Sequence, residues 1–153
     1  MMEEAEMGFR RWGEDVTGCR ALSSEYEGID DPTGLYEALR HVWCAETCAP
    51  RMRKDWTPQN MTLGQCSVTA FLAQDIFGGE VLGILLPDGN RHCFNRVGNC
   101  MFDLTSEQFE EGELDYDVYD PQTREEHFAK EEKRLRYELL REKLRELCSR
   151  SGE

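Results

Sequence analysis

The chain has 153 residues, a length that suits one domain whose folding buries about 70% of the surface exposed by the unfolded chain. Its 31 acidic and 18 basic residues give a formal charge of −13, which repels phosphate backbones and anionic membranes, so we expect no nucleic-acid and no membrane partner. No stretch reaches the ~20 apolar residues of a membrane span and the N-terminus lacks a signal-peptide pattern, so we expect a cytoplasmic protein whose seven cysteines are reduced.

The N-terminal part of the chain predicts an arm and then a helix. Residues 1–31 are acidic, carry scattered glycines and show no helical or strand period, which predicts a loosely ordered N-terminal arm. A single domain is expected to span residues 32–153. It opens at Asp31-Pro32-Thr33, a typical helix start, and apolar side chains then recur at helical spacing until Pro50.

The middle of the chain predicts a helix followed by an antiparallel meander. The helix follows the Gly64 turn, holds Cys66 in or near its first turn, and ends at Gly78-Gly79. Three short runs bounded by turn residues then predict strands over 80–86, 91–97 and 101–105. The last two runs are separated only by Gly98-Asn99, which suits a two-residue hairpin loop.

The C-terminal region predicts one long helix over residues 121–148, opened by Pro121. We expect its apolar stripe to pack on its own domain, which predicts a monomer or a weak homodimer. The predicted stripe consists of Phe128, Leu135, Leu139, Leu140, Leu144 and Leu147.

Cys66, His92 and Asp103 form the candidate catalytic set. The hairpin register makes His92 and Asp103 diagonal neighbours on one sheet face, within reach of each other. If the Cys66 helix packs across that face, one ring nitrogen of His92 meets Asp103 and the other meets the thiol. The imidazolium and the helix N-terminus then favour the thiolate, which makes Cys66 a nucleophile.

An oxyanion formed during such chemistry needs hydrogen-bond donors. The backbone N–H of Cys66 supplies one. Gln65, Asn60 and Gln59 are candidates for a side-chain amide that supplies the other, and the sequence does not choose among them.

Each of these residues also has a structural interpretation. Cys66 can be a small buried filler, His92 a hydrogen-bonded strand residue, and Asp103 the cap of the turn that begins at Ser106. A different alternative is a zinc site built from four cysteines, although the chain lacks the tight CxxC pairs of most structural zinc sites. Its ligands would be Cys44, Cys48, Cys93 and Cys100.

Several segments carry a resemblance to a known family. GQC at Gly64–Cys66, HxxN at His92–Asn95 and DLTxxQF at Asp103–Phe109 occur in this order. Together with the segments 56–60 and 74–80 they resemble the YunG family of small uncharacterised bacterial proteins. The resemblance extends from about Leu35 into the terminal helix, and it implies a shared motif set and fold without an established reaction. Family members often have an aromatic residue directly after the histidine, where this chain has Cys93.

These observations together predict an α+β fold: a small antiparallel β-meander packed against helices, with a long C-terminal helix. The order of Cys66, His92 and Asp103 also resembles, more distantly, the papain- and transglutaminase-like class, which implies a core of that kind. We expect a cofactor-free thiol-dependent hydrolase or acyltransferase that acts on an amide or ester of an unidentified small molecule or peptide. The alternatives are a non-catalytic interaction protein that keeps the motif for structural reasons and a cysteine metal-binding module.

Overall fold

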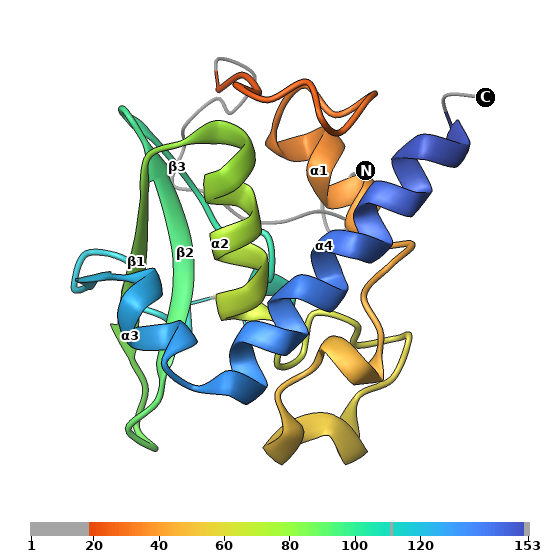
Figure 1. Ribbon diagram of the computed structural model, residues 1–153. Helices are drawn as coiled ribbons and strands as arrows, with labels where there is room; N and C mark the ends of the chain where they lie inside the picture. Colours follow the sequence, from red (N-terminus) through yellow and green to blue (C-terminus); the bar gives the residue numbers. More distant parts are fainter. Residues whose placement is uncertain (1–18, 111, 152–153) are drawn as a thin grey trace, which may run out of the picture.

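A computed structural model describes residues 19–110 and 112–151 of the chain (Figure 1). Short helices come first, three consecutive strands follow, and a long helix ends the chain. In chain order they are α1 (Pro32–Leu39), the 3-10 helices η3 (Ala45–Thr47) and η4 (Pro50–Asp55), α2 (Cys66–Phe77), β1 (Glu80–Leu85), β2 (Arg91–Val97), β3 (Cys100–Phe102), the 3-10 helix η5 (Ser106–Gln108), β4 (Asp120–Gln122), α3 (Arg124–Phe128) and α4 (Glu131–Ser151).

The strands form one four-stranded antiparallel sheet in the order β3-β2-β1-β4. The β2–β3 hairpin pairs Val97 with Cys100 and Asn95 with Phe102, so Gly98-Asn99 is its loop and the predicted register is confirmed. The α+β class and the meander of the first three strands are confirmed as well. The sequence did not predict β4.

The region predicted as one helix over residues 121–148 is divided in the structure. Pro121 lies in β4 opposite Leu82, and the helices α3 and α4 follow separately. Proline lacks the N–H that a sheet ladder uses, and β4 lies at the edge of the sheet, where that loss is tolerated. The predicted helix start at Pro121 is therefore wrong, because pairing with β1 outweighs the local preference of proline for the first turn of a helix.

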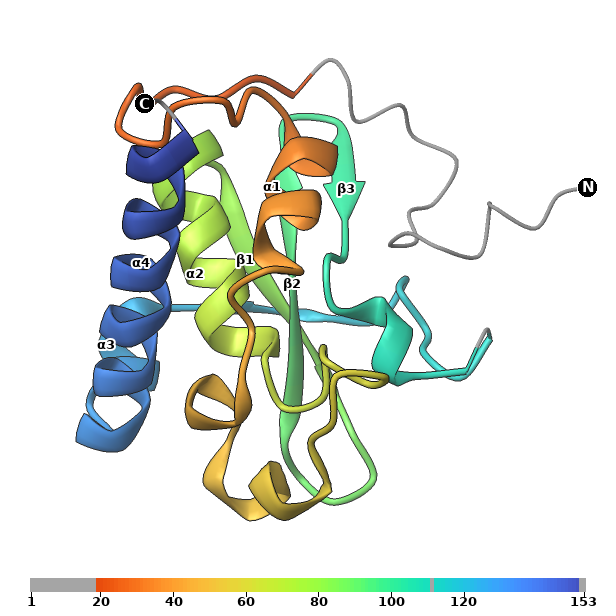
Figure 2. The same cartoon turned by 90° about the vertical axis from the view of Figure 1, so that its right-hand side faces the viewer.

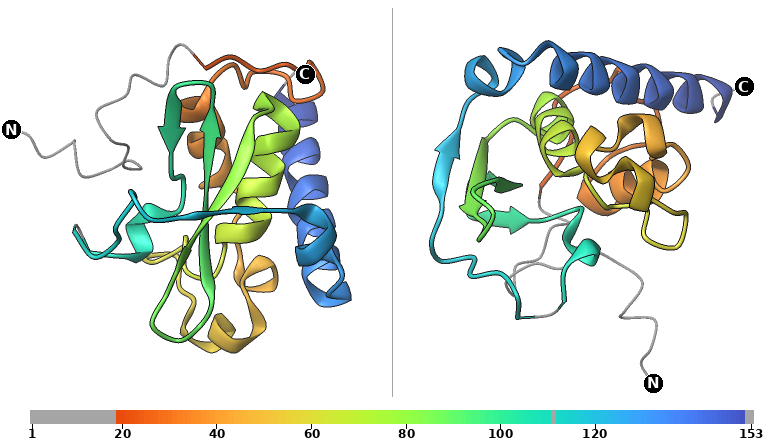
Figure 3. Two further views of the ribbon diagram at one scale, coloured as in Figure 1. Left: turned by 90° about the vertical axis from the view of Figure 1, so that its left-hand side faces the viewer. Right: turned by 90° about the horizontal axis from the view of Figure 1, so that it is seen from below.

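The helices cover one face of the sheet (Figure 2), and the segment from β3 to β4 covers the other (Figure 3). Strand alternation divides β2 between the two sides. Cys93 packs in the cluster formed with α2, whereas Phe94 packs with Leu82, Ile84 and Tyr116 on the opposite face. The sheet is therefore buried on both faces, as the apolar run in β1 predicts.

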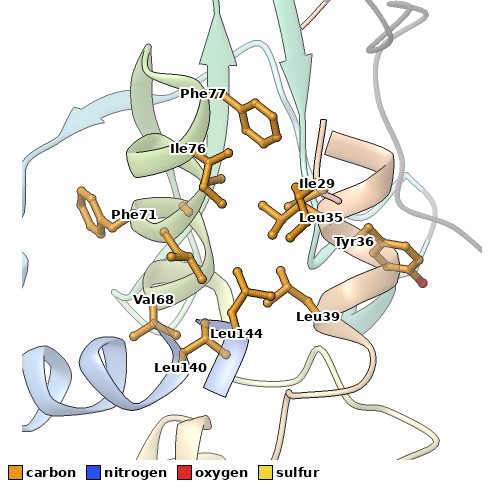
Figure 4. Packing of buried hydrophobic residues seen from close by; sticks show 14 of the residues in the cluster. Ile29, Leu35, Tyr36, Leu39, Val68, Phe71, Ile76, Phe77, Leu140 and Leu144 are labelled. Atoms are coloured by element: carbon orange, nitrogen blue, oxygen red, sulfur yellow. The ribbon is translucent and has the colours of Figure 1, made fainter. Parts of the chain in front are cut away.

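The main core lies between α1, α2 and α4 (Figure 4). Asp31 caps α1 by accepting a hydrogen bond from the Gly34 N–H at 2.9 Å, as the sequence predicts. The helix ends at Leu39, earlier than predicted. After Leu39, the Thr47 hydroxyl oxygen accepts a hydrogen bond from the backbone N–H of Cys44. This bond replaces one that a continued helix would make.

The arm predicted for residues 1–31 lies partly outside the described residues. Of the part that is described, Cys19, Tyr26 and Ile29 are buried in the main core. This segment also bonds to α2, because the Leu22 N–H donates to the Ile76 carbonyl at 2.7 Å. Residues 19–31 are thus part of the packed domain.

Helix α4 packs on its own domain through a stripe that includes the predicted Leu140 and Leu144 but not all of the predicted leucines. Leu135 and Leu139 are 50% and 37% exposed, so placing them in the stripe was wrong. The buried positions follow a spacing of three and four residues that places them on one helix face. They are Arg136, Tyr137, Leu140, Leu144 and Cys148.

Replacing Leu144, which is 0% exposed, tests this packing. We expect Leu144→Ala to lower the free energy of unfolding by about 2–5 kcal/mol, because it removes buried methyl groups and leaves a cavity. Leu139→Ala is the matched control on the same helix and should cost under about 1 kcal/mol. Chemical denaturation of both variants measures the difference, and equal losses would contradict the assigned helix face.

Candidate functional site

Cys66 is the first residue of α2 and follows a tight turn. Gly64 in that turn has a φ of +71°, and a Cβ there would lie 2.5 Å from the Cys48 sulfur, so both conformation and space require glycine. The Gly64 carbonyl accepts from the Ala49 N–H at 2.9 Å, and its own N–H donates to Gln108 Oε1 at 3.2 Å. These bonds fix the backbone that presents the thiol.

His92 and Asp103 form a buried pair, 1% and 0% exposed. His92 Nε2 lies 2.6 Å from Asp103 Oδ2, as the hairpin register predicts. The same oxygen accepts from the Tyr116 hydroxyl at 2.7 Å, while Oδ1 accepts from the Thr105 N–H at 3.2 Å. Asp103 therefore organises the turn after β3, as its structural interpretation proposed, and also holds the imidazole.

The predicted packing of α2 across the His92 face is wrong. Asn95 Nδ2 donates to the Ala70 carbonyl in α2 at 2.9 Å, so α2 lies on the face of Cys93 and Asn95. His92 is on the opposite face because neighbouring strand residues alternate. Cys66 instead approaches the edge of β2 near its first residue, where its sulfur lies 3.8 Å from the Arg91 carbonyl oxygen. This approach is open because β3 pairs with β2 only over Asn95–Val97.

The electrostatics at this edge favour an ion pair. A hydrogen bond from Cys93 and the charge of His92 outweigh burial and hold the pKa of Cys66 well below its usual range. Burial lowers the pKa of His92, but the Asp103 carboxylate and the Cys66 thiolate outweigh it and raise that pKa to about 10. Both shifts favour the thiolate–imidazolium form of the pair over the neutral form.

The geometry of the thiol and the ring is close to, but short of, a hydrogen bond. His92 Nδ1 is buried and has no hydrogen-bond partner among the described residues. No bond of ordinary length and angle joins it to Cys66, yet the two groups shift each other's pKa values.

Cys66 and His92 both line a cleft of about 800 Å³. Its walls come from residues 49–52, the start of α2, the β1–β2 turn, the η5 region and the corner between α3 and α4. Asp103 lies behind His92, outside the lining. A concave site lined by both apolar and polar side chains is the kind of feature in which proteins bind small ligands.

None of the three proposed oxyanion-binding side chains lines this cleft. Gln65 is fully buried, and its Nε2 donates to the Cys44 carbonyl at 3.0 Å. Gln59 and Asn60 belong to the loop closed by the Thr57–Asn60 bridge. The structure therefore brings Cys66, His92 and Asp103 together and leaves Gln65, Asn60 and Gln59 apart from them.

Gln108 lines the cleft and was given no role in the sequence interpretation. Its Oε1 accepts from Gly64 and its Nε2 donates to the Thr105 carbonyl at 3.0 Å, which places the amide beside the Cys66 turn. The DLTxxQF segment was the available signal, because it includes both Asp103 and Gln108.

The cysteines proposed as zinc ligands are distributed over several environments. Cys48 packs against the Gly64 turn, and Cys93 interacts with Cys66. Cys100 interacts with Cys19. Within residues 19–110 and 112–151, no three His, Cys, Asp or Glu side chains are grouped so that they could hold a metal ion. In the same ranges, no helix has the length and apolar character needed to cross a bilayer.

Comparison with known proteins places these motifs in a family. The family model described as YunG protein matches residues 31–149. The uncharacterized protein YunG of Bacillus subtilis (strain 168) is 37% identical over 87 residues, which cover 57% of this chain and 72% of that protein. No solved structure matches this chain. Because the family match includes the helices, the sheet and all three candidate residues, the chain belongs to the YunG family.

Proposed function

We propose that the protein is a thiol-dependent hydrolase or acyltransferase that acts on an amide or ester through a thioester on Cys66. The observation that carries the proposal is a nucleophile at a helix N-terminus that shares a cleft with His92, whose ring is held from behind by Asp103. A papain- or transglutaminase-like core is part of the same proposal. Its support is the order and geometry of these three residues.

In the first half of the reaction, the Cys66 thiolate attacks the carbonyl carbon and forms a tetrahedral oxyanion. Collapse of that intermediate breaks the bond to the amine or alkoxide, which leaves with a proton from the His92 imidazolium. A thioester on Cys66 and a neutral imidazole remain. The imidazole then removes a proton from water or another acceptor as that group attacks the thioester carbonyl carbon. Collapse of the second tetrahedral intermediate breaks the carbon–sulfur bond and releases the acyl product, which leaves the thiolate beside the newly formed imidazolium.

Two donors are available for the oxyanion in this scheme. The N-terminus of α2 has no side-chain cap, which leaves the Cys66 N–H among the unbonded groups of the first helical turn. Gln108 Nε2 has a second hydrogen beyond the one given to Thr105, and its amide lines the cleft. We assign these two groups, in place of Gln65, Asn60 and Gln59, to the oxyanion.

A non-catalytic interaction protein is the second candidate function. The observation that favours it is the bonding of Asp103, which ties Tyr116 and Thr105 to the sheet whether or not Cys66 reacts. Under that interpretation the buried network positions the segment between β3 and β4. It predicts no special reactivity at Cys66.

Acylation by an activated ester distinguishes the two candidates. We expect p-nitrophenyl acetate to release nitrophenolate and leave an acetyl group on Cys66, because the lowered pKa supplies a thiolate near neutral pH. Intact-mass measurement and peptide mapping locate the adduct. Cys66→Ala should abolish it, and Cys44→Ala should leave it unchanged. Acetylation spread evenly over the cysteines, or none, would favour the interaction protein.

A further inference from the structure

The α4 wall of the cleft carries a lysine that lacks an acidic partner. Three cleft-lining arginines have carboxylates beside them: Arg51 contacts Asp88, Arg91 contacts Asp120, and Arg136 contacts Glu132. Lys133 also lines the cleft and is half-buried, yet no described carboxylate lies within ion-pair distance of it. Among the described residues, the hydrogen bond of its side chain is to a ring nitrogen, with Nζ 2.9 Å from His127 Nδ1.

A chain of hydrogen bonds beginning in β4 fixes the direction of that bond. Gln122 Nε2 donates to the Asp120 and Pro121 carbonyls at 3.2 and 3.1 Å, so its Oε1 is the amide atom that faces His127. His127 Nε2, 2.8 Å from this oxygen, must carry a hydrogen. In the neutral ring Nδ1 is then an acceptor, and Lys133 donates to it.

The site is built to hold this arrangement. Burial and the Lys133 charge lower the pKa of His127 to about 4, so the ring is neutral near pH 7 and adds no charge of its own. Gly83 makes room for the Gln122 side chain, because a Cβ there would lie 2.7 Å from the Gln122 amide. The ring occupies one Lys133 hydrogen and leaves two for a group in the cleft.

Lys133 shares the cleft with the Cys66 sulfur. Burial lowers the pKa of the Lys133 ammonium, while interaction with the Cys93 and Cys66 sulfurs raises it. The whole chain carries a formal charge of −13 and so repels anions at long range. An anionic group that enters the cleft therefore needs a local cation, and Lys133 is a cation in the same cleft as the thiol, with no ion-pair partner among the described carboxylates.

We propose that Lys133 is a subsite for a carboxylate of the substrate, so that the acyl donor carries one negative charge close to the carbonyl carbon attacked by Cys66. The inference rests on the proposed function and names its substrate class. A single ammonium matches a singly charged carboxylate better than a phosphate, because the neighbouring arginines already have acidic partners. His127 and Gln122 position the lysine.

Two alkylating reagents of nearly the same size test the subsite. Iodoacetate carries a carboxylate next to its reacting carbon, and iodoacetamide carries a neutral amide there. In both reactions the Cys66 sulfur attacks the methylene carbon, a carbon–sulfur bond forms and iodide leaves. The ratio of the two rate constants cancels differences in thiolate content, because both reagents react with the same thiolate.

We expect Lys133→Gln to lower the iodoacetate rate about tenfold while the iodoacetamide rate changes by less than about twofold. Lys133→Arg should retain most of the ratio, since the positive charge remains. Lys130→Gln is the matched control, because Lys130 lines the same cleft but is exposed. Circular dichroism and the melting temperature show whether each variant is folded.

The possible failures are distinguishable. If Lys133→Gln lowers the iodoacetate and iodoacetamide rate constants equally, the carboxylate subsite is overturned while the nucleophile stays intact. The same holds if Lys130→Gln lowers the iodoacetate-to-iodoacetamide ratio as much as Lys133→Gln does. A Cys66 that reacts with iodoacetamide no faster than the other thiols would instead overturn the proposed function. An iodoacetate-to-iodoacetamide ratio that depends on Lys133 and falls with added salt supports the subsite, because salt screens the attraction between the ammonium and the carboxylate.

Discussion

His92→Gln is expected to lower the rate of Cys66 alkylation at about pH 6.5 by about 10- to 100-fold. The thiolate is held by the Cys93 hydrogen bond and by the His92 charge, and an S–H group is only a weak donor, so the imidazolium is the stronger support. Without it, the pKa of Cys66 should rise toward the ordinary range of a cysteine, so only a small fraction of thiolate remains at that pH. The wild-type protein should stay close to its maximum rate there.

Iodoacetamide labelling followed by peptide mapping measures the rate at each of the seven cysteines. Cys93→Ala is the comparison variant, because it removes the neighbouring thiol and keeps the imidazolium; its loss should be smaller than that of His92→Gln. Cys19, whose pKa burial raises to about 11, serves as an unreactive internal reference. A His92→Gln profile that superimposes on the wild type would show that the imidazolium does not stabilise the thiolate.

The same pair predicts different alkaline behaviour for alkylation and acyl transfer. Alkylation needs only the thiolate, so its rate should persist when the pH passes the His92 pKa of about 10. Acyl transfer also needs the imidazolium as an acid for the leaving group, so its rate should fall there. The two profiles separate the nucleophile from the proton donor.

Local signals in the sequence predicted much of the fold. The Asp31 cap, the Gly64 turn before α2 and the Gly98-Asn99 loop each depend on residues close together in the chain, and the structure confirms all three. The His92–Asp103 contact follows from the hairpin register alone. The sequence therefore predicted the structure best where a turn or a cap sets the positions of residues on either side of it.

Features set by distant partners were missed. Pro121 enters a strand because β1 offers a free edge, and no local signal reports that edge. Helix α4 has leucines on more than one face, and its buried stripe includes the largely polar Arg136, which is held by the Thr47 carbonyl and Glu132. Hydrophobicity alone therefore selected Leu135 and Leu139 wrongly.

At the candidate site, too, the features that the sequence did not predict depend on residues far apart in the chain. Sequence order suggested Cys66 and His92 but not the side from which they meet, because that depends on where β3 stops pairing with β2. The arrangement of Gln122, His127 and Lys133 joins β4, α3 and α4 across the cleft and matches no short motif. Only the folded geometry shows that these side chains share hydrogen bonds.

Asp103→Ala should lower the free energy of unfolding by about 3–5 kcal/mol at neutral pH, because it leaves a buried charged partner without its counter-ion. Asp103 is 0% exposed, and its carboxylate accepts hydrogen bonds from His92, Tyr116 and Thr105, none of which meets a replacement acceptor in alanine. Without the carboxylate, burial favours neutral His92, so the thiolate also loses its partner. Denaturant unfolding and the His92 ring resonances measure the two effects.

Tyr116→Phe is the matched control, since it removes one hydrogen bond to the same carboxylate and should cost about 1.5–3 kcal/mol. The pH dependence identifies the charge. A folded-state pKa of about 10 for His92, raised from 6.5, contributes stability that is fully present below about pH 6.5 and is lost as the pH rises through about 10. The deficit of Asp103→Ala should therefore shrink between neutral pH and about pH 10. A deficit that stays constant over this range would mean that Asp103 holds a neutral ring, and the ion pair at Cys66 would lose its support.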